Sequence, residues 1–151
     1  MKLLYTVLNS TVRALLRSPL HRLMSGNTML LSYRGRRSGK HYELPVSYVR
    51  DGSSIDAFGA RDSLWWRNLF EGPEVTLLVA GEAMRARAQV EAEDHAAIGE
   101  RLGRFLTAVP RDAMPAGVRL RADGTPDPEM LAAAAARHVA MRFDPIAADT
   151  D

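Results

Sequence analysis

The segment with the clearest chemical capacity is a short basic turn bounded by glycines, residues 35–40, with the sequence Gly-Arg-Arg-Ser-Gly-Lys. Backbone N–H groups in such a turn, together with arginine and lysine side chains, bind phosphate or carboxylate through charge-assisted hydrogen bonds. The turn is not a P-loop, because its glycines stand one residue too close and His41 replaces the Ser or Thr that would bind magnesium. It predicts an anion-binding site, with a solvated basic turn as the alternative.

A second candidate is the pair Trp65 and Trp66, followed closely by Asn68. Adjacent residues on a helix point in different directions, so one tryptophan can enter the core while the other borders a groove or a flat ligand. The alternative is that both tryptophans fill the core.

Other catalytic groups are scarce in this sequence. It has no cysteine, which excludes disulfides, thiolate nucleophiles, iron–sulfur clusters and cysteine zinc sites. Its histidines, His21, His41, His95 and His138, include no pair at the spacing that puts two metal ligands on one helix face. A nucleophile elbow and a recognisable pair of catalytic carboxylates are also missing. We therefore expect no catalytic side chain and no metal site.

Charge is distributed unevenly along the chain. Residues 1–68 carry a net charge of +7 and residues 69–151 a net charge of −5, and eight basic residues precede Glu43, the first acidic one. This asymmetry predicts an anionic partner near the N-terminal half, such as a phosphate, a carboxylate, a lipid headgroup or a nucleic acid.

Length and composition favour one globular domain. The chain has 151 residues, of which 46% are hydrophobic and 25% charged, and it contains no apolar run of the roughly 18 residues that span a bilayer. Residues 1–17 have the pattern of an amphipathic helix with a basic polar face, without a convincing signal peptide, and a second short helix is expected near residues 19–25. We expect a cytoplasmic protein whose first helix packs on the domain or a partner chain, or binds a membrane surface.

From residue 28 onward the hydrophobic pattern changes to the period of strands. Asp51-Gly52 predicts a tight hairpin, a second hairpin is expected across Gly81-Glu82, and Pro45 favours a bulge or an edge position. The expected strands are 28–33, 41–50, 54–59, 74–80, 83–90 and 138–143, and the expected helices are 64–71, 91–107 and 129–136, with a loop over 109–127. This order predicts an α+β fold built on a small, closed or half-closed barrel of mostly antiparallel strands.

Several of these segments resemble the deazaflavin (F420)-dependent nitroreductase family. The resemblance is carried by residues 30–40 (Leu-Leu-Ser-Tyr-Arg-Gly-Arg-Arg-Ser-Gly-Lys), 44–52 (Leu-Pro-Val-Ser-Tyr-Val-Arg-Asp-Gly), 64–69 (Leu-Trp-Trp-Arg-Asn-Leu) and 73–75 (Pro-Glu-Val). It implies the split β-barrel of the FMN-binding and pyridoxine-phosphate-oxidase group over residues 27–144, after an N-terminal helical segment, 1–26, and before a tail, 145–151. It also implies coenzyme F420, whose phosphate and oligoglutamate tail match the basic turn.

The resemblance assigns cofactor-binding positions residue by residue. Its implied site comprises Arg36, Arg37, Ser38, Gly39 and Lys40 for the phosphate and tail, Pro45, Val46 and Ser47 along the ring, Gly59, Ala60 and Arg61 after the third strand, and Trp65 and Asn68 closing the site. Tyr42 stands where many members carry an arginine, which removes one anion contact. The loop 60–63 is shorter than the glycine- and lysine-containing loop of many members, with Arg61 as a partial replacement for the charge of that loop. Because the cofactor supplies the hydride, the protein would bind and orient, which agrees with the scarcity of catalytic groups.

The leading hypothesis is thus an F420H2-dependent reductase of a small electron-poor acceptor, such as a quinone, an enone or a nitro compound. One alternative keeps the fold but binds FMN, haem or an apolar ligand. A second alternative is binding to an anionic membrane or a nucleic acid through the first 42 residues, although the sparse aromatic residues argue against a nucleic-acid partner. Pairing of two copies into a homodimer is left open.

Overall fold

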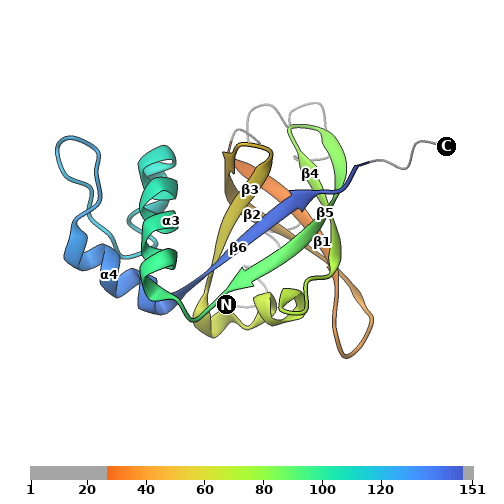
Figure 1. Ribbon diagram of the computed structural model, residues 1–151. Helices are drawn as coiled ribbons and strands as arrows, with labels where there is room; N and C mark the ends of the chain where they lie inside the picture. Colours follow the sequence, from red (N-terminus) through yellow and green to blue (C-terminus); the bar gives the residue numbers. More distant parts are fainter. Residues whose placement is uncertain (1–26, 148–151) are drawn as a thin grey trace, which may run out of the picture.

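Six strands form the body of the molecule in the computed structural model, which describes residues 27–147 (Figure 1). The strands are β1 (Thr28–Arg34), β2 (His41–Asp51), β3 (Ser54–Ala60), β4 (Glu74–Val79), β5 (Glu82–Glu91) and β6 (His138–Pro145); the helices are α3 (His95–Ala108) and α4 (Pro128–Arg137), and the 3₁₀ turns are η1 (Arg61–Ser63), η2 (Trp65–Leu69) and η3 (Pro110–Asp112). The helices expected within residues 1–26 lie outside the described residues, as does the end of the tail. Within residues 27–147, no helix is long and apolar enough to cross a membrane.

The strands close into a barrel in the order β1-β2-β3-β6-β5-β4, with every neighbouring pair antiparallel. Side chains alternate between the two faces of each strand, so Ala57 of β3 and its partner Met141 of β6 both face the interior and are fully buried. The split-barrel architecture expected from the sequence is confirmed.

Both expected hairpins form, but one turn lies elsewhere than predicted. Asp51 pairs with Ser54, and Gly52 in the loop between them has a φ of 62°, which glycine adopts without strain. In the second hairpin Val79 pairs with Glu82, so the turn residues are Ala80 and Gly81, not Gly81 and Glu82. Both have positive φ, as a type I′ turn requires.

The barrel is split between β2 and β3. Strand β2 pairs with β1 over residues 41–47, but it pairs with β3 only over residues 48–51. Among the described residues 27–147, residues 41–47 of β2 therefore have no strand partner on the β3 side. Pro45, which has no N–H to donate, lies in this part, and the unbroken β1–β2 register shows an edge position and no bulge there.

The expected helices need corrections at their ends. Helix α3 begins at His95 instead of residue 91, because the Asp94 side chain accepts the N–H of Ala97 at 3.1 Å while Glu91 still pairs with β6. The helix expected over 64–71 is shorter and of the 3₁₀ type: η2 covers Trp65–Leu69, and Leu64, with a φ of 65°, separates it from η1.

Helices α3 and α4 pack together against the outside of the barrel, beside β3 and β6 (Figure 1). Leu102, Phe105 and Leu106 of α3 form a second apolar cluster, and Phe58 of β3 packs against it, with the rings of Phe58 and Phe105 centred 5.0 Å apart. This arrangement puts an apolar helix face next to the split in the barrel.

Candidate functional site

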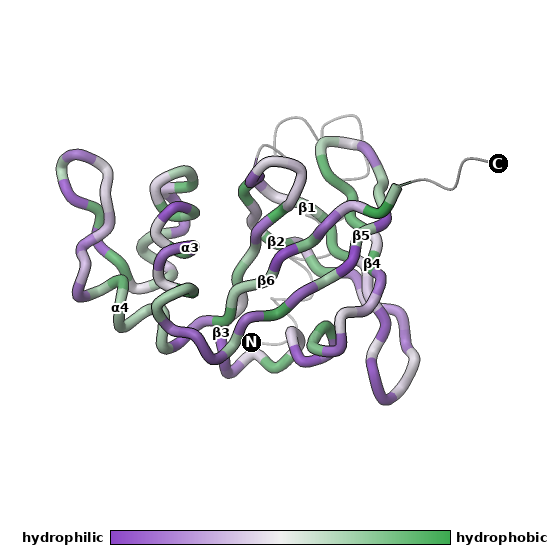
Figure 2. Tube along the Cα trace, in the orientation of Figure 1, coloured by the Kyte–Doolittle hydropathy of each residue, from purple (hydrophilic) through white to green (hydrophobic). Residues whose placement is uncertain are grey.

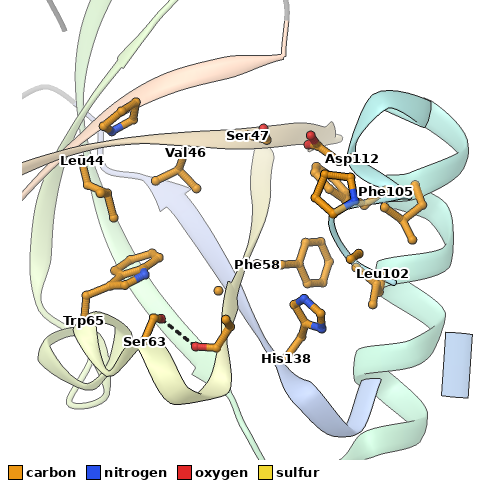
Figure 3. A pocket seen from close by; sticks show the side chains of 16 residues that line it. Leu44, Val46, Ser47, Phe58, Ser63, Trp65, Leu102, Phe105, Asp112 and His138 are labelled. Carbon is orange, nitrogen blue, oxygen red and sulfur yellow. Dashed lines mark hydrogen bonds between the residues drawn. The ribbon is translucent and has the colours of Figure 1, made fainter. Parts of the chain in front are cut away.

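A cavity of about 340 Å³ lies where β2 and β3 separate (Figure 3). Its walls come from β2, β3, α3 and the segment around η3, and Trp65 and His138 border it on opposite sides. The volume is within the range of about 300–1,000 Å³ that small-molecule pockets occupy. We call this cavity the apolar pocket.

A second hollow, of about 530 Å³, adjoins the apolar pocket, since Ser63 and Trp65 line both. Its other lining residues come from η2 and from the loop between β1 and β2, the orange loop that projects from the barrel in Figure 1 and is coloured hydrophilic over much of its length in Figure 2. We call this hollow the basic end. The two hollows together form one cleft with an apolar part and a cationic part.

The loop of the basic end is held in shape by its own backbone. Gly35 donates its N–H to the Lys40 carbonyl at 2.8 Å, and Gly39 donates to the Gly35 carbonyl at 2.9 Å. Glycine is needed twice: a Cβ on Gly35 would come within 2.8 Å of Ser38 Oγ, and Gly39 has a φ of 70°. The Ser38 hydroxyl accepts the Lys40 N–H at 3.2 Å, which leaves its own proton free to donate.

The cations of this loop are available for a ligand. Arg36 and Arg37 line the basic end and are exposed, and among residues 27–147 neither guanidinium has a hydrogen bond or an ion pair. Arg67 of η2 adds a third guanidinium to the lining and stacks on Trp66, 5.5 Å from the ring centroid.

An aromatic row connects the two parts of the cleft. The ring of Tyr42 stacks on Tyr33 at 5.5 Å and 22°, and the ring centroids of Tyr33 and Trp65 lie 6.2 Å apart. Trp65 packs closely against Gly59, where a Cβ would lie 3.2 Å from the indole. Trp66 is buried and donates its Nε1–H to the Arg61 carbonyl, so one tryptophan enters the core and the other borders the cleft.

Asn68 ties the loop to the tryptophan. Its Oδ1 accepts the backbone N–H of Arg36 at 3.0 Å, and its Nδ2 donates to the Trp65 carbonyl at 2.9 Å. The same side chain thus fixes the position of the basic loop and of the turn that carries Trp65.

Most of the residues assigned from the resemblance meet in this cleft. The apolar pocket is lined by Pro45, Val46, Ser47, Gly59, Ala60 and Trp65, and the basic end by Arg36, Arg37, Ser38, Tyr42, Trp65 and Asn68. Gly39 and Lys40 belong to the loop but line neither hollow.

Arg61 lies away from both hollows, and its guanidinium is used for structure. It donates to the backbone carbonyls of Ala92, Ala136 and His138, which joins the ends of β5, α4 and β6. Arg61 therefore adds no charge to the cleft near Tyr42.

The sequence interpretation missed the wall that faces β2 across the apolar pocket. That wall consists of Phe58, Ser63, Leu102, Phe105, Leu106, Asp112, Pro115, Ala116 and His138; at the basic end, Tyr33, Gly35, Leu64 and Arg67 were missed. The helical period of the apolar residues in α3 indicated a buried face, but no signal connected Asp112 or His138 with it. Within the described part of the chain, acidic and histidine side chains form no cluster suited to a metal ion.

A protein-family model matches most of the chain. The family described as F420H(2)-dependent quinone reductase matches residues 9–115. A curated protein of Mycobacterium tuberculosis (strain H37Rv), provisionally named F420H(2)-dependent quinone reductase, is 32% identical over 75 residues, which are 46% of this chain and 63% of that protein. The alignment thus spans less than two thirds of the relative.

Solved structures share the fold at low identity. A pyridoxamine 5′-phosphate oxidase-related, FMN-binding protein of Nostoc punctiforme has a TM-score of 0.57 at 13% identity, over 90% of this chain and 78% of its own. A protein of unknown function from Agrobacterium tumefaciens has a TM-score of 0.56 at 14% identity, over 90% of this chain and 54% of its own. These likenesses show the split-barrel fold.

Proposed function

Because the chain belongs to the F420H2-dependent quinone reductase family, we propose that it uses reduced F420 to reduce a small electron-poor acceptor, with a quinone as the first choice. The observation that carries the proposal is the cleft itself, which joins a loop of unpaired arginines to an apolar pocket in the split of the barrel. A cofactor with an anionic tail and a flat ring needs these two environments side by side.

The basic end supports binding of the cofactor's phosphate and tail. Arg36 and Arg37 are exposed and free of partners among the described residues, and Arg67 lies with them. Arginine binds phosphate and carboxylate groups with two parallel hydrogen bonds, and the Ser38 hydroxyl can donate a further one.

The apolar pocket supports binding of the ring. Residues 45–47 line it on the strand segment that has no partner on the β3 side, so backbone groups on that edge are available to the polar rim of a ring. Trp65 offers an aromatic surface beside it, and the absence of a side chain at Gly59 allows the indole to lie close to β3.

When bound, the reduced deazaflavin supplies the hydride. The chain's own residues bind and orient the two reactants. Leu102, Phe105 and Leu106 make the wall of α3 apolar, which favours an apolar acceptor.

The first test is a fluorescence titration with oxidised F420 of the wild type and the double variant Arg36→Ala/Arg37→Ala. Loss of two charge-assisted contacts is expected to weaken F420 binding at least tenfold, because each such contact contributes about 1.5–3 kcal/mol. The matched control is Arg119→Ala/Arg121→Ala, which removes the same charge from exposed residues outside the cleft.

Equal weakening in both variants would contradict a specific anion site. FMN is titrated in parallel, and binding of FMN in preference to F420 would support the alternative ligand and overturn the cofactor assignment. Oxidation of F420H2 by 2-methyl-1,4-naphthoquinone then tests the activity, and a folded protein that binds F420 but reduces no quinone would refute the acceptor class.

Pairing into a homodimer stays a prediction that analytical ultracentrifugation of the purified chain tests.

A further inference from the structure

His138 separates two cavities. It is the first residue of β6, and it lines the apolar pocket together with Phe58 and Leu102 (Figure 3). It also lines a neighbouring hollow of about 610 Å³, whose other walls carry Arg61, Asp62 and Arg137. His138 thus lines both the apolar pocket and this second hollow, which we call the polar hollow after its charged residues Arg61, Asp62 and Arg137.

The orientation of this imidazole is fixed. Its Nδ1 lies 2.7 Å from the carbonyl oxygen of Ala134, in the last turn of α4. Because a carbonyl only accepts hydrogen bonds, Nδ1 carries the hydrogen and donates it. Nε2 is the remaining nitrogen, and it is free to exchange a proton.

A quinone needs more than a hydride. Its reduction to a hydroquinone requires two electrons and two protons, one of which arrives with the hydride. A protonated side chain in the wall of the apolar pocket can supply the other proton directly to the acceptor.

On the basis of the proposed function, we infer that His138 is the catalytic residue that donates this proton to the acceptor oxygen. The acceptor gains the hydride from the reduced cofactor; the Nε2–H bond of the imidazolium breaks as an O–H bond forms on the acceptor. The imidazole then takes up a proton from solvent through the polar hollow, and the proton that the cofactor loses on oxidation leaves to solvent. The sum is one quinone and one F420H2 converted to one hydroquinone and one F420.

Its place between the cavities distinguishes His138 from the other polar groups of the apolar pocket. Asp112 of η3 lines only the apolar pocket and faces Arg111 at 4.0 Å, and Ser47 cannot exchange a proton with the polar hollow. Among the described residues, His138 is the titratable group that lines both cavities. The charged groups that line these cavities around the imidazole are Arg61 and Asp62 of η1, Arg137 of α4 and Asp112 of η3.

Two substitutions distinguish the loss of the hydrogen bond to the Ala134 carbonyl from the loss of proton transfer at Nε2. In His138→Asn the side-chain amide can still donate to the Ala134 carbonyl, but no group remains at the position of Nε2. In His138→Gln an amide N–H reaches toward the position of Nε2 but cannot transfer a proton. The matched control is His95→Gln, at an exposed histidine that lines neither cavity.

The experiment measures F420 affinity, and kcat and KM for 2-methyl-1,4-naphthoquinone between pH 5 and 9. We expect both His138 variants to bind F420 as the wild type does and to lose kcat about 100-fold or more. The wild-type kcat should fall as pH rises, whereas the kcat of both variants should be nearly independent of pH. Added imidazole should partly restore the kcat of His138→Asn and leave the control unchanged.

The tautomer is read separately, in the cofactor-free protein, from the nitrogen chemical shifts of His138. A hydrogen on Nδ1 is expected, and a bare Nδ1 would overturn the inference. A kcat within threefold of the wild type in His138→Asn would also overturn it and leave the proposed reductase activity standing. A wild-type protein that binds F420 but reduces no quinone would overturn both.

Discussion

At the scale of single residues, Asn68 shows how a side chain can matter to binding without offering the ligand a charge. Its amide accepts from the Arg36 N–H and donates to the Trp65 carbonyl, so it sets the distance between the arginines of the basic loop and the indole of the apolar pocket. A ligand that spans both parts of the cleft depends on that distance.

Asn68→Ala is therefore expected to weaken F420 binding about tenfold. The two lost hydrogen bonds contribute roughly 1 kcal/mol each, and tenfold corresponds to about 1.4 kcal/mol. The measurement is the fluorescence titration, and the control is Gln89→Ala, which removes an exposed hydrogen bond to Asp144 on the barrel wall. An unchanged dissociation constant in Asn68→Ala would show that the loop keeps its position without this side chain.

At the scale of elements, a buried ionic cluster connects α3 to the barrel. Asp56 of β3 is 3% exposed, and Arg142 of β6 binds it with two hydrogen bonds of 2.8 and 3.0 Å. Arg101 of α3 reaches the same carboxylate at 3.3 Å. Burial alone would raise the pKa of Asp56, but the hydrogen bond from Arg142 and the charges of Arg101 and Arg142 outweigh it, so the pKa lies below the usual 3.8.

This cluster predicts how stability depends on pH. Since the folded state lowers the pKa of Asp56, the stabilisation is fully present above the unfolded value near 3.8 and is lost as pH falls through the lower folded value. The free energy of unfolding should thus fall as pH decreases below about 4. For Asp56→Asn it should fall less steeply with pH, and at neutral pH it should be about 3 kcal/mol lower than that of the wild type.

Urea denaturation at a series of pH values measures both effects. Glu82→Gln, an exposed residue in the β4–β5 hairpin, is the control, and it should behave as the wild type. If Asp56→Asn kept the full acid dependence of the wild type, the cluster would not be its source.

Several elements could be predicted because local residues determine them. Asp51-Gly52 produced its hairpin, and alternation along residues 84–90 identified β5. The order of the strands could not be read in this way, since β6 lies between β3 and β5 through contacts that are distant in sequence. Leu64 in a left-handed conformation and the Asp94 cap also depend on the packed structure.

The same distinction applies to the site. Residues 36–38 were indicated by the charge and glycines of their turn, whereas residues 45–47 were indicated by the family resemblance. Asp112 enters the cleft because it follows α3, which packs on the barrel, and His138 enters because β6 pairs with β3, with His138 opposite Ala60. Arg61 had the right charge, but its bonds to three backbone carbonyls take it away from the cleft.

At the scale of the whole molecule, the cleft combines an end lined by exposed cations with an end lined mostly by apolar side chains. These two environments respond differently to ionic strength. Salt screens exposed charges over a Debye length of about 10 Å at 0.1 M, whereas it has little effect on contacts inside an apolar pocket.

We expect the dissociation constant of F420 to rise several-fold between 50 and 500 mM NaCl. The KM for the quinone should change little over the same range, and the salt dependence of F420 binding should flatten in Arg36→Ala/Arg37→Ala. Titrations at four salt concentrations measure this, and a salt dependence that is as steep in the double variant as in the wild type would place the anion site elsewhere.

The order along the sequence of the segments that form the cleft also bears on how such a protein diversifies. The basic loop and the aromatic row come from residues 33–69, whereas α3, η3 and α4 form an excursion that leaves the barrel after β5 and returns at β6. Its two ends are adjacent, because Glu91 pairs with Ala140. The excursion is thus a cassette that recombination, or a designed chimera, can exchange if it keeps the contact of Arg101 with Asp56 and the packing on Phe58. On the proposed function, acceptor preference would then be inherited separately from cofactor preference.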